Sequence, residues 1–201
     1  MISLRVSLIC TISFCAAAFF GASCLAFDNT PLTGEWIECN GRYIQGFKLS
    51  AKSPSSRSGM AESIGTKTLC YSNWEVQGDK LILTGLSIGN RTSSEFKDTL
   101  KIGDILVNQR GNLSYHKIQH LSGTVRFADE QRSFTPSADT PYAGKQYWLI
   151  DPSGELLAEF VNSGEPVWEK ELNCDAIFCD EWQKAEFANK YDGTLKLISL
   201  K

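Results

Sequence analysis

The feature that most constrains the fold is a series of short, strand-like segments joined by tight glycine turns. Residues 74–83 pass from one apolar segment to another through Gly78, and residues 100–107 do the same through Gly103. Glycine supplies the positive φ that a two-residue hairpin turn requires. A third such pattern follows over residues 106–115. Successive hairpins build an antiparallel meander, so the chain is predicted to be mainly β.

The later part of the chain predicts a fourth hairpin, one helix and a last strand. Residues 147–160 carry Pro152 and Gly154 where a turn between two strands requires them. A helical pattern begins at about Asp175 and continues to about Tyr191, and a final strand follows it. The predicted architecture is a single antiparallel meander barrel, or a sandwich, with one C-terminal helix packed on it.

The first 26 residues have the composition of a secretion signal. Arg5 precedes an apolar run over residues 6–20, and small residues then lead to Ala26. This apolar run is too short to span a bilayer comfortably. Cleavage after Ala26 would leave one domain over residues 27–201. The protein is therefore expected to be extracytoplasmic, either secreted or periplasmic.

Cys24 leaves a second interpretation of the signal open. Residues 21–24, Gly-Ala-Ser-Cys, resemble a bacterial lipoprotein box in their last three positions. Cleavage before Cys24 would expose this cysteine for lipid attachment, and the membrane would then hold the protein by a tether. The sequence favours ordinary cleavage, because small residues are also what a signal peptidase requires.

Composition and charge narrow the classes of partner. Of 201 residues, 42% are apolar and 21% charged, which suits an ordinary folded domain. Removal of Arg5 with the signal leaves 19 basic against 23 acidic side chains, a net charge of −4. This acidic balance argues against nucleic acid as a partner. The expected partners are a small apolar ligand or a secreted protein.

Four cysteines remain after the signal: Cys39, Cys70, Cys174 and Cys179. In an oxidising compartment an even number of cysteines predicts two disulfides, and three connectivities are open. The pairs Cys39 with Cys70 and Cys174 with Cys179 are favoured because both are local. The second pair requires that the helix begin after Cys174, since one continuous helix would hold the two α-carbons too far apart.

No catalytic, cofactor-binding or metal-binding residue is predicted, and nothing in the sequence indicates an enzyme. The two histidines, His116 and His120, would share one face of a strand but lie about 13 Å apart. The chain has no nucleophile elbow or glycine-rich phosphate loop. Trp168 is flanked by charge and is a candidate partner contact, although packing in the core is favoured.

The segment 32–36, Leu-Thr-Gly-Glu-Trp, resembles the Gly-x-Trp opening of lipocalins. Lipocalins are similar also in their secretion, their antiparallel meander barrel, and a late helix followed by a final strand. The resemblance implies that Trp36 packs across the closed end of the barrel and that inward-facing apolar side chains line a ligand cavity. The chain departs from the family on its final strand, which has Lys196 where lipocalins usually have an arginine over the tryptophan.

Two functions remain open. The first is an extracytoplasmic binding protein that holds a small apolar or amphipathic ligand in a β-barrel. The alternative is a protein–protein interaction module outside the cytosol, such as an inhibitor or an immunity-type partner of a secreted enzyme. The location of apolar space separates the two, because a ligand needs it inside the barrel and a protein partner needs it on the surface.

Overall fold

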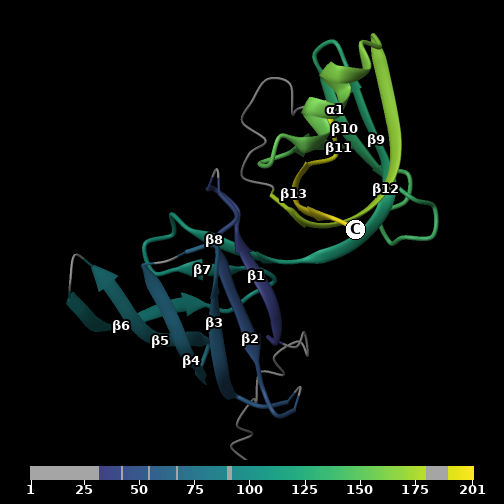
Figure 1. Cartoon of the computed structure of the whole chain (residues 1–201). Coiled ribbons are helices and arrows are strands. Elements are labelled where there is room, and N and C mark those ends of the chain that lie inside the picture. Colours follow the sequence, from purple (N-terminus) through teal and green to yellow (C-terminus); the bar gives the residue numbers. More distant parts are fainter. Residues whose placement is uncertain (1–31, 42, 54, 67, 90–91, 180–189) are drawn as a thin grey trace, which may run out of the picture. The chain divides into compact units, whose positions relative to one another are not determined.

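The computed structural model describes residues 32–201, apart from residues 42, 54, 67, 90–91 and 180–189. The predicted signal, including Ala26 and Cys24, lies outside the described residues. The described part contains thirteen strands and one helix, which confirms the prediction of a mainly β chain with one helix (Figure 1). None of its helices is long and apolar enough to cross a membrane.

The first eight strands close into an antiparallel barrel. They are β1 (Gly34–Glu38), β2 (Gly46–Ser50), β3 (Ser58–Ile64), β4 (Leu69–Gln77), β5 (Lys80–Gly89), β6 (Thr92–Lys101), β7 (Leu106–Asn108) and β8 (Ser114–Lys117). Each strand pairs with its neighbour in sequence, and β8 returns to pair with β1. The predicted antiparallel meander barrel is therefore confirmed for this part of the chain.

The predicted turns lie where the sequence placed them. Gln77 and Lys80 are register partners across a two-residue turn, in which Gly78 has a φ of 62°. Lys101 and Val107 pair across the next predicted turn, which is a longer loop in which Gly103 does not have a positive φ. The hairpin at Gly78 follows from local chemistry, because glycine adopts a positive φ without the steric cost that a Cβ brings.

Alternate residues of the strands face the interior of the first barrel. In β1, Trp36 points inward and is buried, whereas Ile37 points outward into a different cluster. Alternation follows from the two-residue period of a strand. The inward-facing residues form one apolar core: Trp36, Phe47, Leu49, Ala61, Trp74, Leu81, Leu83, Leu100, Leu106 and Tyr115.

A second closed barrel, which was not predicted, follows the first in sequence. It contains β9 (Gln119–Ala128), β10 (Gln131–Pro136), β11 (Tyr147–Ile150), β12 (Val167–Phe178) and β13 (Thr194–Leu200). The strand order is β10-β11-β13-β12-β9, with β9 and β10 also paired. Because β13 lies between β11 and β12 and runs parallel to β11, this barrel is not a simple meander.

The single helix, α1 (Glu155–Ser163), lies between β11 and β12 rather than near residue 175. The fourth predicted hairpin is therefore wrong, since its second strand is this helix. Asp151 explains the difference, because its carboxylate accepts hydrogen bonds from the backbone N–H groups of Gly154 at 3.0 Å and Leu156 at 3.0 Å. Such a side chain satisfies N–H groups that a helix leaves without partners at its start.

The helix predicted from Asp175 onward is also wrong at its beginning. Asp175 to Phe178 are the last residues of β12 and pair with β13. Leu172, Cys174 and Ala176 alternate with outward-facing residues, and this period of two suits a strand. The remainder of the predicted helix lies largely among residues 180–189, outside the described residues.

The structure separates both predicted cysteine pairs, and Cys70 and Cys174 carry free thiols. Cys174 and Cys179 follow one extended strand, so their α-carbons lie about 16 Å apart, well beyond the ~7 Å limit of a disulfide. Cys39 follows β1 and Cys70 lies in β4, three strands away, which amounts to about 14 Å.

Candidate functional site

Trp36 lies in the core of the first barrel, near the end at which β1 begins. The Nε1 of Trp36 donates a hydrogen bond to the backbone carbonyl of Leu32 at 2.8 Å, and its side chain is buried. Lys117 is its register partner on β8, and the Lys117 Nζ lies 6.0 Å from the centroid of the indole ring. This is within the range of a cation–π interaction. Burial lowers the pKa of Lys117 below its ordinary value.

The cation over Trp36 is therefore Lys117 and not Lys196. The reason is that β8, not the last strand of the chain, is the final strand of the first barrel. Lys196 lies on β13, where its Nζ donates hydrogen bonds to the backbone carbonyls of Glu38 at 2.9 Å, Gly41 at 2.7 Å and Tyr43 at 3.1 Å. Its side chain is fully buried.

Aromatic rings continue from Phe47, the register partner of Trp36, toward the end of the barrel at which β1 ends. The ring centroids of Phe47 and Tyr71 are 5.6 Å apart, and those of Phe47 and Tyr115 are 5.0 Å apart. Phe96 continues the group, with its centroid 5.3 Å from that of Tyr71. Such tilted and edge-to-face contacts are favourable for aromatic pairs. We call these four residues the aromatic end.

Polar groups accompany these rings. The Tyr71 hydroxyl donates a hydrogen bond to Asp98 Oδ2 at 3.0 Å. Glu38 is the register partner of Tyr115. Burial, together with the negative charges of Glu38 and Asp98, raises the pKa of Tyr115 to about 12. Burial and the same two carboxylates raise the pKa of Tyr71 further. Both tyrosines are therefore neutral hydrogen-bonding groups at ordinary pH.

The first barrel thus has two chemically different ends. The Trp36 end is packed with aliphatic and indole side chains, whereas the aromatic end combines ring faces with hydroxyl and carboxylate groups. Sequence reasoning found Trp36 but missed Lys117, Tyr71, Tyr115 and Asp98. The alternation of Tyr115 and Lys117 could have been read as one inward face, but only pairing of β8 with β1 brings them to these positions.

Open space is present on the outside of the first barrel. A groove of about 580 Å3 is lined mainly by outward-facing residues of β3, β4 and β5, among them Met60, whose side chain is 71% exposed. A further cavity of about 730 Å3 belongs to the second barrel, between the β9–β10 turn, Trp148 and Phe160 of α1.

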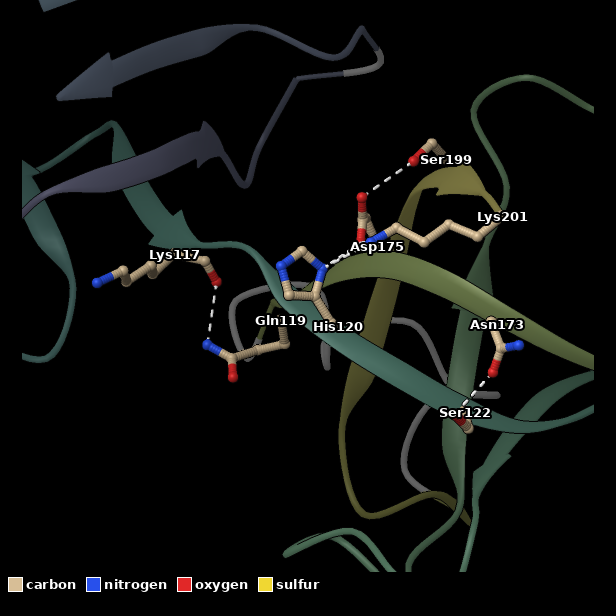
Figure 2. Close-up of polar contacts among 8 residues, drawn as sticks. All are labelled: Lys117, Gln119, His120, Ser122, Asn173, Asp175, Ser199 and Lys201. Atoms are coloured by element: carbon tan, nitrogen blue, oxygen red, sulfur yellow. Dashed lines mark hydrogen bonds and ion pairs between the residues drawn. The ribbon is translucent and has the colours of Figure 1, made fainter. Parts of the chain in front are cut away.

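A polar network occupies the outer face of the second barrel (Figure 2). Asp175 contacts the Nδ1 of His120, and the Lys201 Nζ lies 2.8 Å from the same carboxylate. The Ser199 hydroxyl donates to Asp175 Oδ2 at 3.3 Å. Partial burial opposes ionisation, but hydrogen bonds from Lys201 and His120 lower the pKa of Asp175 overall. Because Ser199 contacts the carboxylate and not the imidazole, the network lacks the serine–base contact that activates a nucleophile.

The remaining predicted residues lie apart from each other. His116 is buried on β8, whereas His120 lies on β9 in the second barrel. Within the described residues, no group of three metal-ligating side chains could hold a metal ion. Trp168 packs on the core of the second barrel, its ring centroid 5.8 Å from that of Phe127, so the structure gives it the core position that the sequence favoured.

Comparison with known proteins concerns the first barrel. Residues 28–118 match the model of a family described as lipocalin-like. A solved lipocalin-like protein from Bacteroides thetaiotaomicron VPI-5482 is 37% identical, and the match covers 43% of this chain and 95% of that protein, with a TM-score of 0.34. Among curated proteins, none matches this chain.

Proposed function

We propose that the first barrel, whose residues match a family described as lipocalin-like, binds a small amphipathic ligand at its aromatic end. The observation that carries the proposal is the contrast between the two ends. Trp36 and Phe47 are fully buried in the core, so the proposed site lies at the partly buried residues Tyr71 and Phe96.

The chemistry of the aromatic end supports a ligand with an apolar body and a polar group. The partly buried rings of Tyr71 and Phe96 are available to the apolar part. The carboxylates of Asp98 and Glu38 can accept hydrogen bonds from the polar group of a ligand. The Tyr71 hydroxyl donates a hydrogen bond to the carboxylate of Asp98. Binding sites for small molecules usually combine such an apolar lining with a few placed polar groups.

Binding can be tested with N-phenyl-1-naphthylamine, an uncharged apolar probe that gains fluorescence when it leaves water. Phe96→Ala removes one half-buried ring from the aromatic end. We expect the Kd of the variant for the probe to be about tenfold higher than that of the wild-type protein, a loss of ~1.4 kcal/mol in binding free energy. Met60→Ser is the matched control, because it removes an apolar side chain from the outer groove. The control should leave the Kd unchanged.

An unchanged Kd in Phe96→Ala, together with weaker binding in Met60→Ser, would overturn the proposal. That result would favour the alternative function, a module that binds another protein, because exposed Met60 lies in a groove on the outer face of the barrel. Purification of the intact protein with a stoichiometric partner that Met60→Ser loses would then identify the groove as the contact surface.

Export is the remaining part of the proposal. The basic and apolar composition of residues 1–26 supports a signal for secretion or for the periplasm. The mass of the mature protein tests it directly. A chain that begins at Phe27 indicates a soluble protein, and an acyl-sized increment on Cys24 indicates a membrane tether. A full-length mass would contradict export.

A further inference from the structure

Two cysteines that the favoured pairing kept apart lie in one buried cluster. Cys39 follows β1, Cys179 follows β12, and both are 0% exposed. They form a cluster with Ile37 and Ile177. Both isoleucines face away from the interior of their own barrel, since their sequence neighbours Trp36 and Ala176 face inward. The cluster therefore joins an outer face of one barrel to an outer face of the other.

Backbone hydrogen bonds fix the segment of each cysteine. The Cys39 N–H donates to the carbonyl of Ser114 at 2.9 Å, and the Cys179 N–H donates to the carbonyl of Thr194 at 2.8 Å. Cys179 thus extends the β12–β13 ladder to a position two residues from Lys196. Neither cysteine lies in an exposed loop, and rearrangement of either would break a strand pairing.

Lys196 brings the two segments together. Its Nζ bonds the carbonyls of Glu38, Gly41 and Tyr43, which flank Cys39 on both sides. Ile177, two residues before Cys179, is the register partner of Lys196. The same ammonium group is therefore held against the segment of Cys39 and against the strand of Cys179. A nearby cation favours the thiolate form, which is the reactive species in thiol–disulfide exchange.

We propose that Cys39 and Cys179 form a disulfide that joins the two barrels. The thiolate of one cysteine attacks a disulfide oxidant, such as oxidised glutathione, and releases one thiol of that oxidant. The second cysteine then displaces the other thiol, so the two cysteines lose two protons and two electrons, and the oxidant gains them. Because both sulfurs are buried in the folded chain, the exchange occurs as the barrels dock during folding.

The other two cysteines serve as internal controls. Cys70 is exposed on β4, and Cys174 is buried within the core of the second barrel. Cys70 is held away from Cys39 by the spacing of the strands between β1 and β4. Cys174 is held away from Cys179 because β12 is extended. The proposal therefore names one connectivity, in which Cys70 and Cys174 stay reduced.

A peptide map of the intact protein tests this connectivity. The full chain is refolded with reduced and oxidised glutathione, then denatured in iodoacetamide without reductant, digested and analysed by mass spectrometry. We expect one linked peptide pair that contains Cys39 and Cys179, with Cys70 and Cys174 alkylated. Alkylation of Cys39 to the same extent as Cys70, or a link from Cys39 to any other cysteine, would overturn the proposal.

Thermal stability gives a second readout. Reduction should lower the Tm of the wild-type protein by about 10 °C, because the bond closes a long loop. Cys39→Ser should have the Tm of the reduced wild-type protein whether or not reductant is present. Cys70→Ser should lose as much Tm on reduction as the wild-type protein does. If Cys39→Ser does not fold, Cys179→Ala provides the same comparison. An equal Tm for oxidised and reduced wild-type protein would contradict a bond between the barrels.

Discussion

The two barrels differ in how their strands are connected. In the first barrel every strand pairs with its neighbour in sequence, and the ring closes by the pairing of β8 with β1. In the second, β13 inserts between β11 and β12 and runs parallel to β11. The first barrel therefore depends on local hairpins, whereas the second depends on contacts between distant segments. This difference explains why turn patterns revealed one barrel and concealed the other.

The largest expected effect concerns the core of the first barrel alone. Trp36→Ala should lower the free energy of unfolding by about 4 kcal/mol, because it leaves a large cavity in the core of the first barrel. Urea denaturation measures the loss. Hydrogen exchange should locate it in residues 34–117, with residues 119–200 little affected. Equal loss of protection in both regions would show that the two barrels unfold as one unit.

Lys196→Met tests the connection between the barrels. Methionine fills similar space but donates no hydrogen bond, so three carbonyl groups around Cys39 lose their shared donor. We expect a loss of about 3 kcal/mol, since unsatisfied buried polar groups are costly. Both barrels should lose protection in hydrogen exchange. Lys196→Arg is the control that keeps the charge. An unchanged free energy of unfolding in Lys196→Met would show that the ammonium group does not connect the two barrels.

The stability of the first barrel should fall at alkaline pH because of Tyr115 at the aromatic end. The folded state raises the pKa of Tyr115 to about 12 from an ordinary value of 10.0, so the unfolded chain loses its proton first. The contribution of Tyr115 is complete below pH 10 and is lost as pH rises toward 12, by about 2 kcal/mol. Thermal melts at pH 9 and pH 11.5 measure the loss. Tyr115→Phe should reduce it, and an unchanged pH dependence would contradict this assignment.

The smallest expected effect belongs to the second barrel. Asp151→Ala removes the carboxylate that accepts the N–H groups at the start of α1, and we expect a loss of about 1 kcal/mol. Asp151→Asn should restore part of it, because an amide oxygen can still accept. Hydrogen exchange should place the change in residues 155–163. Faster hydrogen exchange in the first barrel would show that α1 stabilises both barrels.

The sequence predicted the parts of the candidate site that depend on short-range patterns. Gly-x-Trp located Trp36, and the turns at Gly78 and Gly103 located the hairpins. It missed Tyr71 and Asp98, since a strand pattern does not show which distant residues share one end of a barrel. The sequence also predicted strands after residue 115, at residues 147–160 and at the end of the chain, and these were the available sign of a second barrel.

By itself, the sequence determined that the chain is mainly β, that its first part is a meander, and that Trp36 lies within it. Glycine turns and two-residue alternation are local properties, so they act wherever the chain folds. Tertiary structure decided that β8 and not β13 closes the first barrel, that Lys117 therefore lies over Trp36, and that residues 155–163 are helical. It also brought Cys39 and Cys179 into one cluster. These outcomes depend on pairing between distant strands, where burial and hydrogen bonding across the whole chain outweigh local preference.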